Sequence, residues 1–205
     1  MIRTTPVVSP LLLPRAILFD MDGTLTDDCL DFDEIKEEIG LGDSPVLEVL
    51  PTLEPEERER IEKVLHRWEA EGAAACALAA GCVELLEWVR ERGIKSALIT
   101  RNNKRSIETV LERHGLSFEV RLSRDCLNGK YKPDPEPLWH ACERLGVDRA
   151  DAWMVGDWKY DIEAGNAASI KTVWLDGGRE RPFDAVPWKS VKDLHELRAL
   201  LGALV

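Results

Sequence analysis

The sequence predicts an α/β protein with a doubly wound, Rossmann-like parallel sheet and a small α-helical cap. Short apolar runs alternate along the chain with segments of helical periodicity, which is typical of parallel strands connected by helices. Residues 27–80 interrupt this alternation and contain helical patterns only. We therefore expect a core made of residues 1–26 and 81–205, and a cap made of residues 27–80.

The strands and helices of the core follow from these patterns in order. Apolar runs predict strands at 16–19, 97–99, 118–122, 152–155 and 172–175. Apolar residues spaced by three or four positions predict helices at 83–92, 106–114, 138–145, 162–168 and 193–201. Gly93 and Gly115 directly follow two of these helices, as expected for residues that end a helix.

Two amphipathic helical patterns occupy the cap. Residues 56–71 carry one apolar stripe, made of Ile61, Val64, Leu65 and Trp68. A shorter apolar stripe precedes it and is made of Phe32, Ile35 and Ile39. We expect Trp68 to lie in the core of the cap. His66 and Arg67 lie off the stripe, so we expect them on the surface.

Two carboxylates, Asp20 and Asp22, follow the first apolar run, within Asp-Met-Asp-Gly-Thr-Leu-Thr. Side chains two residues apart in an extended chain point to the same side. Both carboxylates would therefore project from the carboxyl end of the strand, where parallel sheets bind ligands. One could attack phosphorus and form an aspartyl phosphate while the other moves protons. Taken alone, the pair also fits an ordinary Asp-Gly turn that Asp20 caps.

Two further segments supply groups that could bind an anion. Thr100 follows the second apolar run and precedes a helix, whose N-terminus favours a negatively charged ligand. Its hydroxyl could instead only cap that helix. Lys132 lies in Lys-Pro-Asp-Pro, where two prolines prevent a helix or a central strand. It could reach the site as a fixed positive charge, although a single loop lysine is usually a solvated surface residue.

Acidic residues also follow the fourth apolar run, where Gly-Asp-Trp-Lys-Tyr-Asp contains Asp157 and Asp161. Mg²⁺ prefers oxygen ligands and needs only one or two protein carboxylates in addition to waters and phosphate oxygens. These residues therefore predict a magnesium site at the edge of the sheet where the first pair of carboxylates lies.

With these four motifs in chain order, the sequence resembles the haloacid dehalogenase superfamily of aspartate-nucleophile hydrolases, from Arg15 to about Leu175. The resemblance implies that Asp20 is the nucleophile and Asp22 the general acid and base. Dehalogenases of this superfamily lack an acid at the second position, and phosphonate-cleaving members carry a small residue there. Asp22 therefore points to a phosphate ester, whose alkoxide leaving group needs a proton.

The resemblance implies a phosphate site as well. Thr100 and Lys132 would bind the phosphate, with Lys132 also restraining the carboxylate of Asp20. We add Arg101 and Asn102, which follow Thr100, to the predicted substrate-binding residues. Arg101 stands where the family often has a smaller polar residue. Its guanidinium could pair with a carboxylate of the leaving group, or it could be a solvated surface residue.

The resemblance also implies a set of magnesium ligands. Mg²⁺ would bind Asp20, the backbone carbonyl of Asp22 and Asp157, with Asp161 supporting these ligands from close by. Trp158 departs from the family pattern, which usually has a small hydroxyl residue at this position. We expect its indole simply to pack against its surroundings.

Composition and charge narrow the possible partners. The 205 residues are 44% hydrophobic, which is enough for a substantial core. The net charge of -11 and the isoelectric point near 4.9 disfavour nucleic acid and anionic membranes, since both require a basic surface. An anionic substrate then needs a locally positive patch, for which the candidates are Lys132, Arg101, Arg105 and Arg124.

Cysteine usage and the N-terminal segment suggest a cytoplasmic protein. The five cysteines show no Cys-x-x-Cys spacing, which favours a reducing compartment. Residues 7–14 are apolar but interrupted by prolines, and they are too short for a transmembrane helix or a persuasive signal peptide. We expect this segment to form an N-terminal arm.

The favoured function is a Mg²⁺-dependent phosphatase acting on a small phosphorylated metabolite, with phosphoglycolate-like esters a reasonable substrate class. The alternative enzyme is a sugar phosphomutase of the same superfamily, which would need a larger cap to hold a bisphosphate intermediate. The alternative outside enzymes is a catalytically idle binding module. The short cap predicts an open site and a broad range of substrates. Discrimination among these substrates would come from residues 29–32, the polar side of 56–71 and Arg101. The sequence gives no oligomeric state.

Overall fold

Six parallel strands form one sheet at the centre of the structure, a computed structural model that describes residues 12–42 and 44–205. The strands are β1 (Ala16–Phe19), β2 (Lys95–Ile99), β3 (Val120–Leu122), β4 (Ala152–Gly156), β5 (Lys171–Leu175) and β6 (Lys189–Val191). Their order across the sheet is β3-β2-β1-β4-β5-β6. The chain thus builds outward from β1 on one side and then on the other, as in a doubly wound fold.

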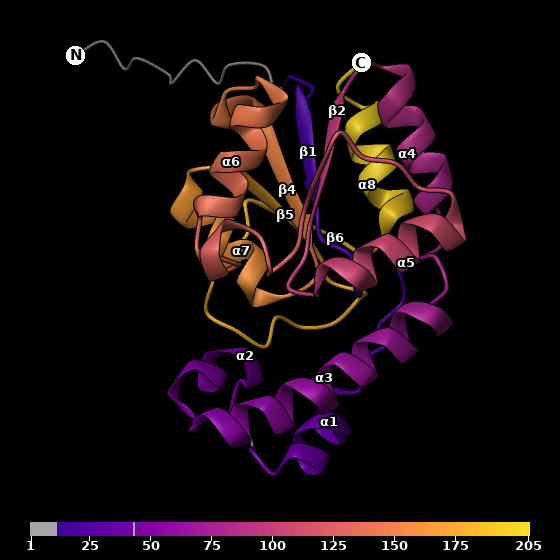
Figure 1. Cartoon of the computed structure of the whole chain (residues 1–205). Coiled ribbons are helices and arrows are strands. Elements are labelled where there is room, and N and C mark those ends of the chain that lie inside the picture. The colour runs from indigo at the N-terminus through magenta and orange to yellow at the C-terminus, as the bar shows by residue number, and fades with distance from the viewer. Residues whose placement is uncertain (1–11, 43) are drawn as a thin grey trace, which may run out of the picture.

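Helices cover both faces of the sheet, because successive side chains of a strand point to opposite sides. Ile17 and Phe19 pack against α4, α5 and α8, whereas Ala16 and Leu18 pack against α6 and α7. Figure 1 shows α6 and α7 on one side of the sheet and α4 and α8 on the other. These helices are α4 (Cys82–Glu91), α5 (Lys104–His114), α6 (Glu136–Leu145), α7 (Lys159–Ala168) and α8 (Leu194–Gly202).

The register of the central strands brings three loops together. Phe19, the last residue of β1, lies beside Leu98 of β2 and Val155 of β4. Because the three strands are parallel and end at nearly the same level, the residues that follow them meet at one edge of the sheet. This carboxyl edge is where ligands bind in doubly wound sheets.

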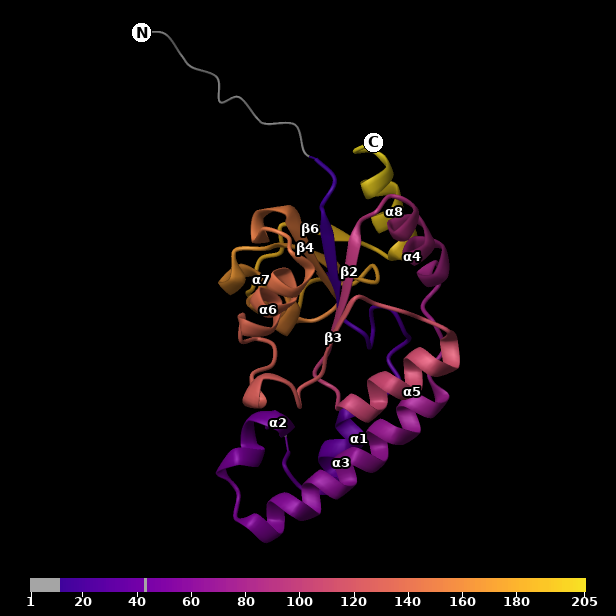
Figure 2. The ribbon, with the colours of Figure 1, turned by 45° about the horizontal axis from the view of Figure 1, so that its top comes forward.

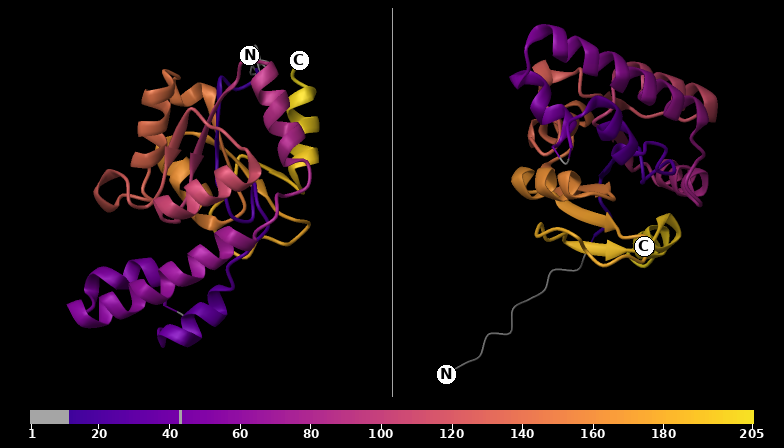
Figure 3. Two further views of the ribbon diagram at one scale, coloured as in Figure 1. Left: turned by 45° about the vertical axis from the view of Figure 1, so that its right-hand side comes forward. Right: turned by 90° about the horizontal axis from the view of Figure 1, so that it is seen from below.

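Three helices form a separate layer beyond this edge: α1 (Phe32–Ile39), α2 (Val46–Val49) and α3 (Pro55–Ala75). Figure 3 shows, in its left view, α1 and α3 packed against each other below the sheet. Their apolar side chains form a hydrophobic cluster apart from the two clusters of the sheet, with Leu30, Ile35, Ile39, Val46, Leu50, Ile61 and Leu65 buried in it. Short 3₁₀ helices cover Leu50–Thr52, Leu127–Gly129 and Arg149–Asp151.

The long helix α3 joins this layer to the core. Ile61 packs in the cluster of the small layer, whereas Ala73, near the end of the helix, belongs to a cluster of the sheet. Figure 2 shows α3 running alongside α5, and the two helices are in contact. The two connecting segments lie side by side, since the Asp27 N–H donates to the Ala77 carbonyl at 3.0 Å. We therefore propose that residues 27–80 are the cap, docked on the core through the last turns of α3.

The structure confirms the predicted α/β fold and every predicted strand and helix, with ends shifted by a few residues. The sequence prediction missed α2 and β6, because segments of four and three residues are too short to show a periodic pattern. His66 and Arg67 are exposed, as predicted. Trp68 packs against the cap cluster but stays half-buried, because its Nε1 donates to the exposed Glu38 at 2.8 Å. Within the described residues, none of the helices has both the length and the apolar character needed to cross a bilayer.

Gly165 sets how closely α7 approaches β5, and this contact can be tested. A Cβ at this position would lie 1.8 Å from Thr172 Oγ1 and 3.2 Å from Thr172 Cβ. We expect Gly165→Ala to reduce the free energy of unfolding by about 1–3 kcal/mol, as overpacking does, when measured by urea denaturation. Gly202→Ala is the control, because its Cβ would meet only the flexible end of Arg198. Equal stability of the two variants would contradict the tight contact.

Candidate functional site

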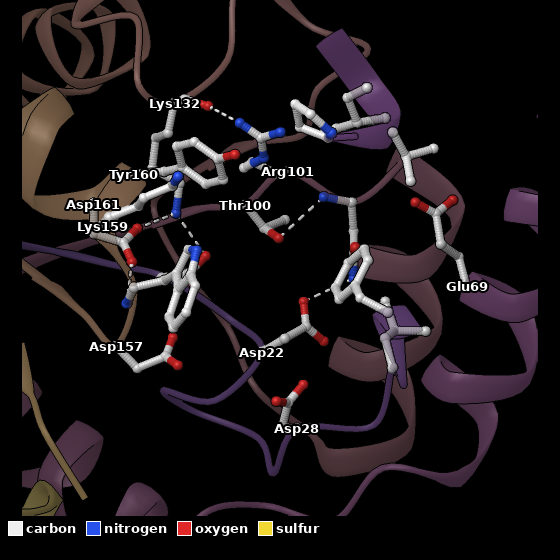
Figure 4. Close-up of a pocket in the computed structure, with 18 of the residues that line it drawn as sticks. Asp22, Asp28, Glu69, Thr100, Arg101, Lys132, Asp157, Lys159, Tyr160 and Asp161 are labelled. Atoms are coloured by element: carbon white, nitrogen blue, oxygen red, sulfur yellow. Dashed lines mark hydrogen bonds and ion pairs between the residues drawn. The ribbon is translucent and has the colours of Figure 1, made fainter. Parts of the chain in front are cut away.

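A cavity of about 830 Å³ lies at the carboxyl edge of the sheet, lined by residues of both the core and the cap. Figure 4 shows side chains from several different loops converging on it. All eight of the predicted site residues line this cavity, namely Asp20, Asp22, Thr100, Arg101, Asn102, Lys132, Asp157 and Asp161. The structure therefore brings together residues that are up to 141 positions apart in the chain.

Asp20 lies at the end of β1 and is held from two sides. Its backbone N–H donates to the Val155 carbonyl at 2.9 Å, which continues the β1–β4 ladder. Its Oδ1 accepts a hydrogen bond from Lys132 Nζ at 2.6 Å. Burial raises the pKa of Asp20 to about 6, against the opposing effect of the Lys132 charge. One oxygen is thus fixed by Lys132, and the side chain as a whole is 13% exposed toward the cavity.

Lys132 is a buried cation rather than a surface residue. Its side chain is 2% exposed, and Nζ donates to Asp20 and to Asp161 at 2.6 Å each. Burial alone would lower the pKa of Lys132, but the charges of Asp161 and Asp20 outweigh it and raise the pKa above its usual value. The ammonium group therefore stays protonated at neutral pH, as the sequence motif predicted for a fixed positive charge.

Asp157 and Asp161 complete a cluster of carboxylates with Asp20, in which one oxygen of each lies within 4.8 Å of the others. Both oxygens of Asp161 are engaged, Oδ1 by Lys132 and Oδ2 by the backbone N–H of Trp158 at 3.1 Å. Burial first, and then the charge of Asp20, raises the pKa of Asp157 to about 8. Three carboxylates thus face one ammonium group, so this donor set fits a divalent cation that prefers oxygen ligands.

The close approach of Gly23 to this cluster explains why the first motif contains glycine. Gly23 adopts a φ of +71°, which L side chains rarely take. A Cβ here would lie 2.5 Å from Asp157 Oδ2. Only glycine allows the turn after β1 to pass the carboxylate of Asp157.

Asp22 points into the cavity and is paired with Asn102. The Asn102 Nδ2 group donates to Asp22 Oδ2 at 2.8 Å. Burial, followed by the charge of Asp20, raises the pKa of Asp22 to about 8. The sequence placed Asn102 among the substrate-binding residues, whereas the structure gives its amide a partner within the protein. Its observed contact orients Asp22.

Thr100 lies on the cavity wall with its hydroxyl proton free to donate. Its side chain is buried, and Oγ1 accepts a hydrogen bond from the Asn102 N–H at 3.1 Å. A hydroxyl that accepts one bond can still donate its own hydrogen to an anion. Thr100 is not the N-cap of α5, because Asn103 has that role and accepts from the Ser106 N–H.

Arg101 has several partners within the protein. Its guanidinium donates to Glu48 Oε1 of the cap at 2.7 Å and to the Lys132 carbonyl. It also lies over the rings of Tyr160 and Tyr131, at 3.9 and 5.0 Å from their centroids. The sequence left open whether Arg101 pairs with a ligand or is solvated. The structure shows a third arrangement, in which Arg101 connects the core to the cap.

The other two arginines considered for a positive patch lie elsewhere. Arg124 forms a two-pronged ion pair with Glu69 of α3, whose side chain is 2% exposed. Arg105 is exposed and does not line the cavity. Neither arginine therefore offers a free charge to a ligand in this arrangement.

Sequence reasoning missed part of the cavity wall. Lys36 of α1 and Lys159 and Tyr160 of α7 also line the cavity, as does Phe32, which lies within residues 29–32 that were expected to select the substrate. Lys159 and Tyr160 lie inside the Gly-Asp-Trp-Lys-Tyr-Asp motif, but the sequence assigned them no role. The spacing of Phe32 and Lys36 was the available signal, because residues four apart lie on the same face of a helix. That spacing could not show which face meets the core.

The sequence model of the family described as haloacid dehalogenase-like hydrolase matches residues 29–175. The chain belongs to this family. The match covers more than half of the 205 residues, and the motif that contains Asp20 and Asp22 lies just before it. The resemblance inferred from the four motifs is therefore confirmed, and the protein is an enzyme of the haloacid dehalogenase-like hydrolase class.

Individual members of the family cover most of the chain. An N-acetylmuramic acid 6-phosphate phosphatase of Pseudomonas aeruginosa is 31% identical, over 83% of this chain and 85% of its own length. A phosphoglycolate phosphatase of Pseudomonas putida is 30% identical, over 94% of this chain and 80% of its own. The crystal structure of a hydrolase from Pseudomonas syringae superposes with a TM-score of 0.74 at 21% identity, over 93% of this chain and 99% of the other, and supports the fold.

The ion pair between Arg101 and Glu48 should contribute to cap docking. Removing one partner leaves the other charged group without its counter-charge, whereas removing both partners removes only the interaction between them. We expect Arg101→Ala and Glu48→Ala each to destabilise the protein, with a coupling energy of about 1 kcal/mol in a double-mutant cycle of urea unfolding. Lys63 and Glu59, an exposed pair within α3, serve as the control cycle. Strictly additive effects of the Arg101 and Glu48 substitutions would show that this pair does not hold the cap.

Proposed function

We propose that this enzyme is a Mg²⁺-dependent phosphomonoesterase that works through a phosphoaspartate on Asp20. The observation that carries the proposal is the position of Asp20 on the cavity wall, with one oxygen fixed by the buried Lys132 at 2.6 Å. A carboxylate restrained in this way is oriented for attack by its other oxygen. The named phosphatases among the relatives support the same class of reaction.

The proposed reaction has two steps. In the first, an Asp20 oxygen forms a bond to phosphorus, the ester bond breaks, and Asp22 gives its proton to the leaving oxygen. In the second, Asp22 takes a proton from water, the water oxygen attacks phosphorus, and the bond to Asp20 breaks to release inorganic phosphate. Asp22 ends each cycle protonated, as it began. The hydrogen bond from Asn102 keeps its carboxyl directed toward the cavity.

The phosphate would be bound by Thr100 and Lys132. The free hydroxyl proton of Thr100 can donate to a phosphate oxygen, and the Lys132 ammonium group offsets its negative charge. Asp20, Asp157 and the backbone carbonyl of Asp22 would hold Mg²⁺, with Asp161 supporting them through Lys132. When bound, Mg²⁺ would supply positive charge that offsets the repulsion between these carboxylates and the phosphate.

A phosphomutase would share the phosphoaspartate chemistry of this phosphatase but use a different acceptor for the phosphoryl group. It would return the phosphoryl group from Asp20 to a sugar hydroxyl instead of to water, and the same assay distinguishes the two reactions. We place the enzyme in the cytoplasm as part of this proposal, because all five cysteines are free thiols.

Phosphate release from a panel of phosphorylated metabolites tests the proposal. We expect hydrolysis of at least one phosphomonoester with Mg²⁺, none with EDTA, and none by Asp20→Asn, because an amide is a poor nucleophile and a weaker metal ligand. Circular dichroism of the variant controls for folding. Isomerisation without phosphate release would instead indicate a mutase, and activity that survives in Asp20→Asn would refute the proposed nucleophile.

A second variant separates proton transfer from metal binding. Asp22→Asn keeps the backbone carbonyl that would bind Mg²⁺ but removes the acid, so we expect turnover to fall by roughly 10²- to 10⁴-fold with Mg²⁺ affinity little changed. Isothermal titration with Mg²⁺ and steady-state kinetics provide the two measurements. A parallel loss of metal affinity would mean that the Asp22 side chain, and not its carbonyl, belongs to the metal site.

A further inference from the structure

Trp158 is unusually exposed for a large aromatic residue, and it lines the candidate active site. Among the described residues, the six exposed large hydrophobic side chains are Leu12, Phe32, Val83, Trp158, Val186 and Val205. Only Phe32, from the cap, and Trp158, from the core, line the 830 Å³ cavity. The sequence led us to expect that Trp158 simply packs, yet 43% of its surface is accessible.

Other aromatic side chains pack against Trp158 and hold its ring in position. Its ring meets Phe183 edge-on at 5.8 Å, and Phe183 meets Trp174 of β5 in the same way at 5.3 Å. Trp174 Nε1 donates to the Asp157 carbonyl at 2.8 Å. The backbone N–H of Trp158 is in turn bound to Asp161. These contacts hold the indole in one position. The Trp158 side chain would therefore lose little conformational entropy when a ligand contacts its exposed part.

The charges around the cavity disfavour a second anion on the substrate. Nine carboxylate side chains but only five cationic ones line it. Within this set, Lys132 and Arg101 are already paired with Asp20 and Glu48. Lys36 and Arg179 lie 3.9 Å from Asp33 and Asp157, and Lys159 lies over the ring of Tyr160 at 5.1 Å. Asp22 is protonated in the proposed mechanism and Glu69 is paired with Arg124, which leaves seven carboxylates against five cations. A divalent cation would add two positive charges and a bound phosphate about two negative ones, so this smaller surplus of carboxylates would persist. A neutral leaving group avoids the repulsion that a second anionic group would meet.

The same carboxylates are suited to hydroxyl groups. Asp28 and Asp31 lie on the segment that leads into α1, Asp33 lies in the first turn of α1, and all three line the cavity. Asp31 uses Oδ1 to cap α1, which leaves its other oxygen free to accept. Ionised carboxylates only accept hydrogen bonds, so they pair with donors such as sugar hydroxyls.

We propose that Trp158 is a specificity-determining residue, which stacks on the nonpolar face of a neutral sugar ring in the leaving group. The substrate class would be sugar phosphates whose hydroxyls reach the carboxylates of residues 28–33, rather than short carboxylated esters such as phosphoglycolate. The electron-rich face of an indole attracts the C–H groups of such a ring. This inference rests on the proposed phosphatase function and specifies its substrate.

Kinetics on paired substrates test the inference. For the best-hydrolysed member of a panel of aldose phosphates, we expect Trp158→Ala to lower kcat/KM by about 10-fold, mainly through KM, and Trp158→Phe to recover most of the loss. Glycerol 1-phosphate has the hydroxyls but no ring, so its kcat/KM should change less than about twofold. Val83→Ala is the matched control, because Val83 is also 43% exposed but does not line the cavity. Equal losses for ring and acyclic substrates would overturn the inference, as would a wild-type preference for phosphoglycolate.

Binding measurements separate this inference from the proposed function. Hydrolysis of none of the substrates by the wild-type enzyme would refute the phosphatase and leave the ring site to be judged by binding. The probe is a non-hydrolysable phosphonate analogue of glucose 6-phosphate, titrated by calorimetry in the presence of Mg²⁺. We expect Trp158→Ala to weaken its binding by about 10-fold, with no such change for the glycerol phosphonate. Unchanged affinity in Trp158→Ala would refute the stacking role.

Discussion

The buried ion pairs of Lys132 are the interaction on which the rest of the site depends. Its ammonium group lies 2.6 Å from both Asp20 and Asp161, with both Lys132 and Asp161 only 2% exposed. Breaking a buried pair of this kind costs about 3–5 kcal/mol, because it leaves an uncompensated charge away from water. The pairs tie together β1, the proline-containing loop and α7. Asp20, Lys132 and the carboxylate of Asp161 therefore keep fixed positions relative to one another.

A second set of ion pairs holds the cap and shows how an acidic chain distributes its few cations. In each pair the cap supplies the acid and the core the arginine: Glu48 with Arg101, and Glu69 with Arg124. These arginines lie close to the cavity, yet their charge is used within the protein. Lys132 is likewise occupied by carboxylates. A chain of net charge -11 thus uses these three cations within the protein, and under the proposed function much of the affinity of the site for phosphate would come from a bound divalent cation.

The site residues that follow the ends of the strands could be predicted from the sequence, whereas the contacts of the side chains around them could not. Asp20, Thr100 and Asp157 each follow an apolar run, and parallel strands bring such positions to one edge whatever the details of packing. The partner of Arg101 was beyond prediction, because Glu48 lies in a four-residue helix with no periodic pattern, 53 positions away. Trp158 packs against Phe183 as expected, but how much of its ring stays exposed was beyond prediction for a related reason. Whether an aromatic side chain is covered depends on neighbours such as Phe183, which belong to a loop without a motif.

One carboxylate, that of Asp161, contacts both Lys132 and Trp158. Under the proposed function, the side chain that would meet the leaving group could therefore be changed without disturbing the residues proposed to carry out the reaction. Asp161 holds Lys132 with Oδ1 and the backbone N–H of Trp158 with Oδ2. The bond to Trp158 involves no side-chain atom of that residue. Any residue except proline can supply the N–H, so the indole can be exchanged without removing a hydrogen bond from Asp161 or from Lys132. The side chain at position 158 is therefore free to respond to the leaving group, because the fixed charge beside Asp20 does not depend on it.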